Sequence, residues 1–153
     1  MLTKVAVTVA ATLGASLLGI ASAEARPDVV GYRGDYAPGT IVVKTKERRL
    51  YLIVDQDRAI RYPVGVGKAG KQWTGTAHIE GKYREPAWAP PADVKHDNPN
   101  IPDVIAGGSP SNPMGVAAMM LPGSGPHAIH GTNRPGSVVG CVCYGRIRMY
   151  NED

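Results

Sequence analysis

Hydrophobic and polar residues alternate along most of this chain with the two-residue period of half-buried β-strands. Strands are predicted at residues 40–45, 49–54 and 59–66, which are rich in β-branched and aromatic side chains. Further strands are predicted at 74–83, 115–121, 127–131 and 144–149. No helical period persists over 12 residues once the N-terminal segment is set aside. The pattern therefore predicts a mainly β fold.

A proline-rich segment at residues 85–113 interrupts this alternation. It contains Pro86, Pro90, Pro91, Pro99, Pro102, Pro110 and Pro113. Repeated proline excludes a long helix, because each ring removes a backbone donor and clashes with the preceding turn. The segment is too long for a plain connector in a compact domain, so we predict a functional lid or wall. Trp88 within it, and Trp73 before it, are interpreted as core or cleft-wall residues.

The N-terminal stretch has the pattern of an export signal. One charge, Lys4, precedes an uncharged run from Val5 to Ala23, which ends in small residues, and Ala23-Glu24-Ala25 also suits a signal peptidase. We predict a signal peptide at 1–25 that is cleaved on export to the periplasm or cell wall, leaving no membrane span. An uncleaved membrane anchor is the alternative. Residues 26–37 are polar and are predicted to form a leader arm.

Composition narrows the function classes. The 153 residues fit one domain, predicted at 38–153. Lys and Arg number 17 against 13 Asp and Glu, and this scattered surplus of +4 gives no basis for nucleic-acid binding. Two cysteines are too few for a disulfide scaffold. The glycines at 65–70 have the spacing of a dinucleotide fingerprint, but no helix is predicted after them, so no nucleotide cofactor is expected.

The candidate chemistry lies near the C-terminal end. His130-Gly131-Thr132-Asn133 ends a predicted strand, and a second segment runs from Cys143 to Asp153. A histidine and a thiol on separate segments are typical of cysteine nucleophile chemistry, in which the imidazole takes the thiol proton. Nearby positive charge favours the thiolate.

These motifs resemble those of the L,D-transpeptidase catalytic domain (YkuD) family. The family has His-Gly-Thr-Asn followed by Ser-x-Gly-Cys-Ile/Val-Arg-Met/Leu, often with Asn-Glu-Asp. The resemblance covers about Pro38 to Asp153 and includes the stretches 38–43, 62–67, 73–76, 88–91 and 112–115. It implies a β sandwich with a cradle-shaped cleft, and a chain that ends before the closing strand of other members.

The resemblance also implies a reaction. A cysteine thiolate attacks the diamino-acid carbonyl of a tetrapeptide stem in peptidoglycan and releases the terminal D-alanine. An amine of a second stem, or of an outer-membrane lipoprotein, then accepts the acyl group. No metal and no organic cofactor are implied. His130 is the expected general base.

The sequence departs from the family pattern at the nucleophile. Aligned on Gly145, Arg148 and the Asn-Glu-Asp ending, the nucleophile position is occupied by Arg146, and Cys143 stands at the family's serine. A guanidinium stays protonated and cannot accept an acyl group. Three accounts remain open: an inactive peptidoglycan-binding module, takeover of the reaction by Cys143, and a damaged or incomplete gene. In an extended segment positions 143 and 146 face opposite sides, so takeover requires a turn, which Gly145 permits.

The remaining site expectations concern substrate binding. Gly131, Thr132 and Asn133 are expected to contact substrate, and the Gly145 N–H is a candidate oxyanion-hole donor. Arg148 is expected either to clamp a substrate carboxylate or to pair with Glu152 or Asp153. Cys141 and Cys143 together with His127 and His130 make a weaker zinc alternative, because the two histidines alternate across a strand.

Overall fold

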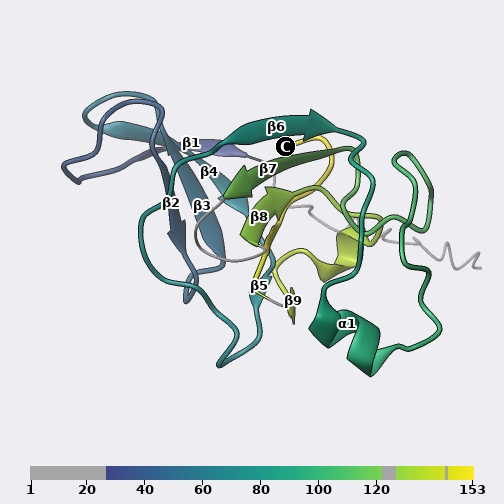
Figure 1. Cartoon of the computed structure of the whole chain (residues 1–153). Helices are drawn as coiled ribbons and strands as arrows, with labels where there is room; N and C mark the ends of the chain where they lie inside the picture. The colour runs from purple at the N-terminus through teal and green to yellow at the C-terminus, as the bar shows by residue number, and fades with distance from the viewer. Residues whose placement is uncertain (1–26, 122–126, 144) are drawn as a thin grey trace, which may run out of the picture.

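The predicted strands pair into two four-stranded sheets in the computed structural model, which describes residues 27–121, 127–143 and 145–153. The first sheet is antiparallel, in the spatial order β1 (Asp28–Gly31), β4 (Arg58–Pro63), β3 (Arg49–Ile53) and β2 (Ile41–Lys44). The second has the order β10 (Ile147–Arg148), β8 (His127–His130), β7 (Ala117–Leu121) and β6 (Gly81–Arg84). Its β10–β8 pair is parallel, and its other pairs are antiparallel (Figure 1).

A short parallel pair, β5 (Val66–Gly67) and β9 (Cys141–Cys143), adjoins the second sheet. The connection is made by Gly65, which exchanges backbone hydrogen bonds of 2.8 and 2.9 Å with Arg148 of β10. The strands therefore follow one another laterally as β8, β10, β5 and β9. This order separates the backbone of β9 from that of β8.

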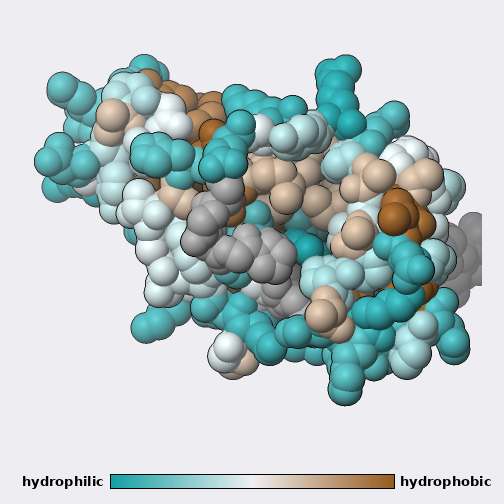
Figure 2. All heavy atoms as spheres, viewed as in Figure 1, coloured by the Kyte–Doolittle hydropathy of each residue, from teal (hydrophilic) through white to brown (hydrophobic). Residues whose placement is uncertain are grey.

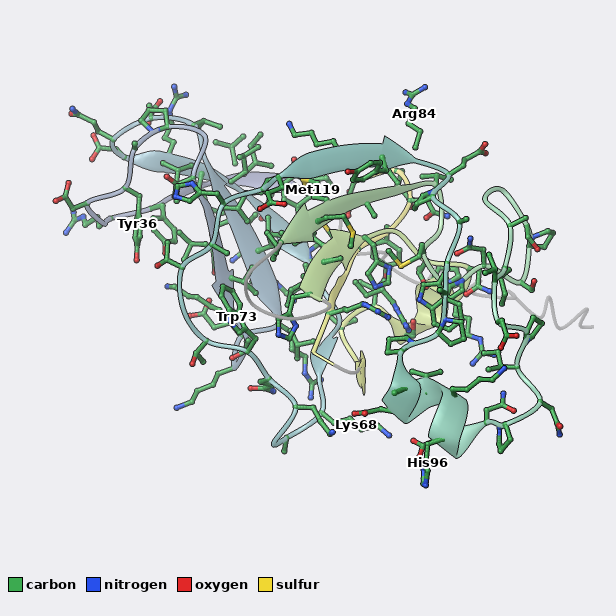
Figure 3. The ribbon with its side chains drawn as sticks, viewed as in Figure 1. Tyr36, Lys68, Trp73, Arg84, His96 and Met119 are labelled. Carbon is green, nitrogen blue, oxygen red and sulfur yellow. The ribbon has the colours of Figure 1, made fainter. Side chains whose placement is uncertain are left out.

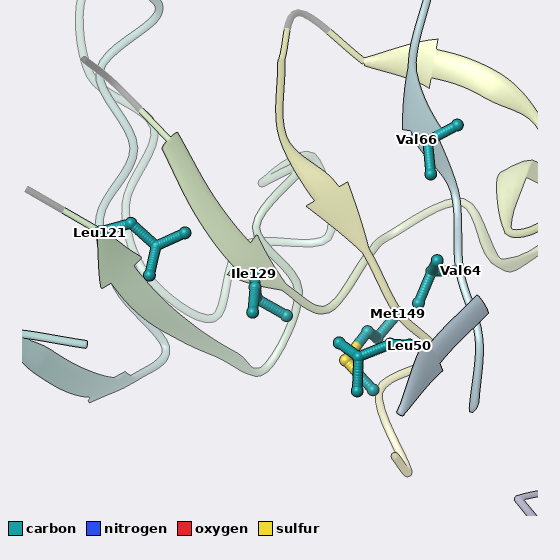
Figure 4. Packing of buried hydrophobic residues seen from close by; sticks show 6 residues of the cluster. All are labelled: Leu50, Val64, Val66, Leu121, Ile129 and Met149. Atoms are coloured by element: carbon teal, nitrogen blue, oxygen red, sulfur yellow. The ribbon is translucent and has the colours of Figure 1, made fainter. Parts of the chain in front are cut away.

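The main core lies between the two sheets. Its buried residues are apolar and come from both sheets and from the segments that follow β4 and β10: Leu50, Val64, Val66, Leu121, Ile129 and Met149 (Figure 4). Ile129 is the residue of β8 that points into this core, so its neighbours Ala128 and His130 point to the opposite face, since side chains alternate along a strand. Two sheets around one apolar layer form a sandwich, and the predicted mainly β fold is confirmed.

The proline-rich segment covers that opposite face of the second sheet. It holds one short helix, α1 (Ala92–Asp97), which begins directly after Pro91. In Figure 1 the segment lies to the right of β7 and β8, and the first sheet lies to the left. A second apolar cluster fills the contact, formed by Trp88, Met114, Ala118 and Ala128. None of the helices in the described part of the chain is long and apolar enough to span a bilayer.

The structure corrects three details of the predicted elements. Part of the predicted leader arm is the edge strand β1, which pairs with β4. The predicted strand 59–66 is split, because Pro63 ends β4 and Gly65 turns to a new partner, Arg148. The predicted strand 74–83 begins only at Gly81, since Gly75 has a φ of +146°, which side chains rarely adopt.

Candidate active site

His130 is the last residue of β8 and lies at the centre of the candidate site. It is opposite Ala118 of β7 and beside Arg148 of β10. Residues directly paired across neighbouring strands share one face of a sheet, so these three side chains face the proline-rich wall. The imidazole is buried, with 4 % of its residue surface exposed.

The imidazole is held in one tautomer by its neighbour in the chain. The Nδ1 atom lies 2.6 Å from the carbonyl oxygen of Gly131. A carbonyl only accepts, so Nδ1 carries the hydrogen, and Nε2 of the neutral ring remains a proton acceptor. Burial, together with the charges of Arg146 and Arg148, lowers the pKa of His130 to about 4 despite the opposing hydrogen bond to Gly131. At neutral pH His130 is therefore an uncharged base.

Asn151 fixes the turn that follows His130. Its Oδ1 accepts hydrogen bonds from the backbone N–H groups of Thr132 at 2.8 Å and Val116 at 3.3 Å, and its Nδ2 donates to the Thr132 carbonyl at 2.9 Å. The approach is so close that a side chain at Gly131 would collide with Asn151 Oδ1. Gly115, with a φ of +65°, is equally confined, because a Cβ there would collide with the Thr132 nitrogen. The glycine of the His-Gly-Thr motif is thus required by packing.

The residues predicted to contact substrate in this turn have internal partners. Thr132 is buried, and its hydroxyl accepts a hydrogen bond from the Arg134 N–H at 3.0 Å. Asn133 is exposed, and its Nδ2 donates to the Pro110 carbonyl at 3.0 Å, which ties the turn to the proline-rich segment. Their contact with substrate remains a prediction.

Arg148 extends the site away from β8. Its Nη1 donates to the Ser137 hydroxyl at 2.7 Å, and Ser137 donates in turn to the Arg134 carbonyl at 2.5 Å. Of the two expected roles, an ion pair with Glu152 or Asp153 is not found among the described residues. The Nε atom of Arg148 is buried without a hydrogen-bond partner. Arg146, two residues earlier, is close enough for its charge to act on His130.

The wall opposite His130 is pinned by Asn112, a buried residue that the sequence reasoning did not single out. Its Nδ2 donates to the carbonyls of Pro86 at 2.9 Å and Ala106 at 3.0 Å, and its Oδ1 accepts from the Met114 N–H at 2.9 Å. One amide therefore joins both ends of the segment. The prediction of a wall at 85–113 agrees with this arrangement.

Beyond the covered area the same face continues as an exposed apolar surface. Met120 of β7 and Tyr83 of β6 belong to this face by register, and they are 37 % and 53 % exposed. Figure 2 shows one side of the molecule, on which pale-brown, apolar atoms in the region of β6 and β7 are bordered by polar groups. An extended ligand reaching His130 would cross both kinds of surface.

Cys143 is placed by its backbone on a different strand from His130. It pairs with Gly67 in the β5–β9 ladder, which is a two-stranded sheet separate from the sheet that contains β8. Gly145, with a φ of +80°, makes the turn between β9 and β10. The Gly145 carbonyl accepts a hydrogen bond of 2.7 Å from Nδ1 of His127, at the opposite end of β8 from His130. The side chains of Cys141 and Cys143 lie outside the description, so Cys143 as nucleophile remains a prediction, as does the Gly145 N–H as oxyanion donor.

No group of three or more His, Cys, Asp or Glu side chains that could hold a metal ion occurs in the part of the chain that the structure describes. The chemistry available at the described site is that of one neutral imidazole and two guanidinium groups. It can accept a proton at Nε2 and attract a carboxylate, because the guanidinium fork matches two carboxylate oxygens.

Comparison with known proteins agrees with this geometry. The L,D-transpeptidase catalytic domain family (YkuD) matches residues 38–153. The chain is 32 % identical over 122 residues to the "Probable L,D-transpeptidase ErfK/SrfK" of Escherichia coli K12, and 34 % identical over 122 residues to the "Probable L,D-transpeptidase YbiS" of the same strain. Each match covers 74 % of this chain and 38 % of the relative, so the chain spans well under half of their length. A crystal structure of the "Probable carnitine operon oxidoreductase caia" from Brucella melitensis is similar in fold, with a TM-score of 0.63, 36 % identity, and coverage of 84 % of this chain and 83 % of that one.

Proposed function

This chain belongs to the L,D-transpeptidase catalytic domain (YkuD) family, and we propose that it recognises peptidoglycan stem peptides on the face around His130. We include export in the proposal, since the pattern at 1–25 has the features of a signal peptide and the polymer lies outside the cytoplasm.

The observation that carries the proposal is a buried, neutral histidine flanked by two arginines. A stem peptide that ends in D-alanine presents a carboxylate, and Arg146 and Arg148 supply positive charge on the face where His130 lies. Arg148 is already oriented by Ser137, so less side-chain entropy is lost when it binds an anion. His130 adds no competing charge at neutral pH, and its Nε2 can accept a hydrogen bond from a ligand N–H group.

Acyl transfer is the second candidate function, and the tautomer of His130 favours it. In this reaction Nε2 would take the thiol proton of Cys143, the sulfur would attack the diamino-acid carbonyl, and D-alanine would leave with that proton. The amine of a second stem, or of an outer-membrane lipoprotein, would then displace the sulfur and restore the thiol. This route requires the thiol of Cys143, a residue of β9, to reach Nε2 of His130.

One set of measurements separates the two functions. The protein is titrated with tetrapeptide muropeptides by calorimetry, and the same mixtures are analysed by mass spectrometry for released D-alanine and cross-linked product. Binding that weakens in Arg146→Ala without any product supports recognition alone. Product that disappears in Cys143→Ala but persists in the matched control Cys141→Ala supports acyl transfer. Absence of both binding and product in the wild type overturns the proposal.

Restoring the family residue tests the scaffold directly. In Arg146→Cys a thiol stands at the family position, and we expect D-alanine release together with a covalent carbapenem adduct detected by intact mass. Loss of the adduct in the double variant Arg146→Cys, His130→Asn would assign the base to His130. Inactivity of a folded Arg146→Cys protein would count against an otherwise competent site.

A further inference from the structure

Trp88 carries a buried hydrogen-bond donor that the protein leaves unpaired. The residue is 7 % exposed, and its indole Nε1 has no hydrogen-bond partner. Leaving such a donor unsatisfied destabilises the folded protein, because the N–H group has lost its bond to water and gained none in return. Unpaired buried groups are uncommon in native proteins, and a functional site is one of the reasons for keeping them.

The unpaired donors of the described residues coincide with the candidate site. Three buried side-chain atoms lack a partner, and two of them are N–H donors, Trp88 Nε1 and Arg148 Nε. Trp88 packs in one cluster with Ala118 and Ala128. Ala118 is the cross-strand partner of His130, and Arg148 is its neighbour on the other side. Trp88 thus belongs to the layer that covers the His130 face, and Arg148 belongs to the sheet beneath it.

The wall holds the indole in place instead of letting it turn to solvent. The backbone of Trp88 exchanges two hydrogen bonds of 2.8 Å with Ile105, and Asn112 ties the segment on either side of that pair. The ring is packed against Met114 and two alanines, which offer no strong acceptor. The described residues therefore leave Nε1 free to donate to a molecule that enters the site.

We propose that Trp88 is a ligand-binding residue whose Nε1 donates a hydrogen bond to a carbonyl or carboxylate oxygen of the bound stem peptide. The inference rests on the proposed function, and it assigns the wall an active part in binding. Since Nε1 is covered in the structure, the ligand inserts between the wall and the sheet and displaces the atoms that cover it. The hydrogen bond formed on insertion removes the cost of the unpaired donor, which favours the bound state.

The chain offers a direct spectroscopic test, because it has two tryptophans. Trp73 is half-buried and lies 5.8 Å from the His127 ring, on the side of β8 away from α1 (Figure 3). In ¹⁵N-labelled full-length protein, the two indole N–H signals are assigned with Trp73→Phe. On titration with a tetrapeptide muropeptide, we expect the Trp88 signal to move downfield and the Trp73 signal to stay in place.

Affinity provides the second readout. Trp88→Phe keeps an aromatic ring and removes the donor, and we expect its muropeptide affinity to fall about five- to tenfold, the equivalent of one hydrogen bond of about 1 kcal/mol. Trp73→Phe is the matched control and should bind as the wild type does. A Trp88 signal that stays still during saturation overturns the inference, whether or not Trp88→Phe folds. If folded Trp88→Phe binds muropeptide with unchanged affinity while Arg146→Ala binds more weakly, the inference about Trp88 is overturned and the proposed function still stands. Absence of binding by the wild type overturns both.

Discussion

Replacing His130 by asparagine should remove a specific part of the acid sensitivity of this protein. Burial, with the charges of Arg146 and Arg148, lowers the pKa of His130 from its ordinary value of 6.5 to about 4. In the unfolded chain the imidazole takes up a proton near pH 6.5, whereas in the folded protein it does so only near pH 4. Between these values the unfolded state binds more protons, so the free energy of unfolding falls as the pH is lowered.

The size of the effect follows from the difference between the two pKa values. The difference corresponds to about 3 kcal/mol in the free energy of unfolding. This stability is fully retained above pH 6.5 and fully lost below pH 4. Carboxylates that hold ion pairs, such as Asp103 with Lys95, also lose stabilisation on acidification. Their contribution is common to the wild type and His130→Asn, so the difference between the two proteins isolates the histidine.

The assay is urea unfolding followed by circular dichroism at several pH values from 7 to 4. Over this range the free energy of unfolding should fall by about 3 kcal/mol more in the wild type than in His130→Asn. His96→Asn is the matched control, because His96 is an exposed residue of α1 that points away from the sheets (Figure 3), and it should follow the wild type. Parallel pH profiles for the wild type and His130→Asn would refute the assignment of His130 as a buried neutral base.

Three further substitutions test the packing around the site. Gly115→Ala introduces a Cβ against the Thr132 nitrogen at a positive φ. Urea unfolding should show that the free energy of unfolding falls by more than about 2 kcal/mol. A decrease of less than about 1 kcal/mol would contradict the tight turn. Leu50→Ala leaves a cavity in the main core and should lower the free energy of unfolding by about 2–5 kcal/mol in the same assay. A smaller decrease would mean that the two sheets do not share this core. Lys71→Ala breaks an exposed ion pair of 2.9 Å with Asp93, and a change in stability above about 1 kcal/mol would show that this contact holds the wall in place.

The parts of the fold that could be predicted from sequence are those governed by local alternation. Strands β2, β3, β7 and β8 lie within their predicted ranges, and in β3 the neighbours Leu50 and Tyr51 pack in two different buried clusters, as alternating side chains do. The edge strand β1 was missed, since three of its four residues are exposed and show no apolar period. The predicted strand at 74–83 lacks a partner along most of its length, and pairing is not visible in a single segment.

The candidate site was predictable only in part, for a related reason. The position of His130 at a strand end follows from the pattern around it, but the polar residues that support it act across long sequence separations. Asn112 joins carbonyls on either side of Trp88, and Asn151 joins the turn after His130 to Val116. An isolated asparagine in a sequence gives no indication of which distant backbone groups its amide will satisfy.

The strand order also bears on whether Cys143 can replace the family nucleophile. Arg146 precedes β10, whose partner is β8, whereas Cys143 ends β9, whose partner is β5. A shift of three residues in the chain therefore moves the backbone from one ladder to another. The Gly65–Arg148 bridge and the His127–Gly145 hydrogen bond fix the backbone of this region. For this reason we expect recognition of the stem peptide to be retained more readily than acyl transfer, since His130 and Arg148 are paired across β8 and β10, whereas the backbones of Cys141 and Cys143 belong to the separate β5–β9 ladder.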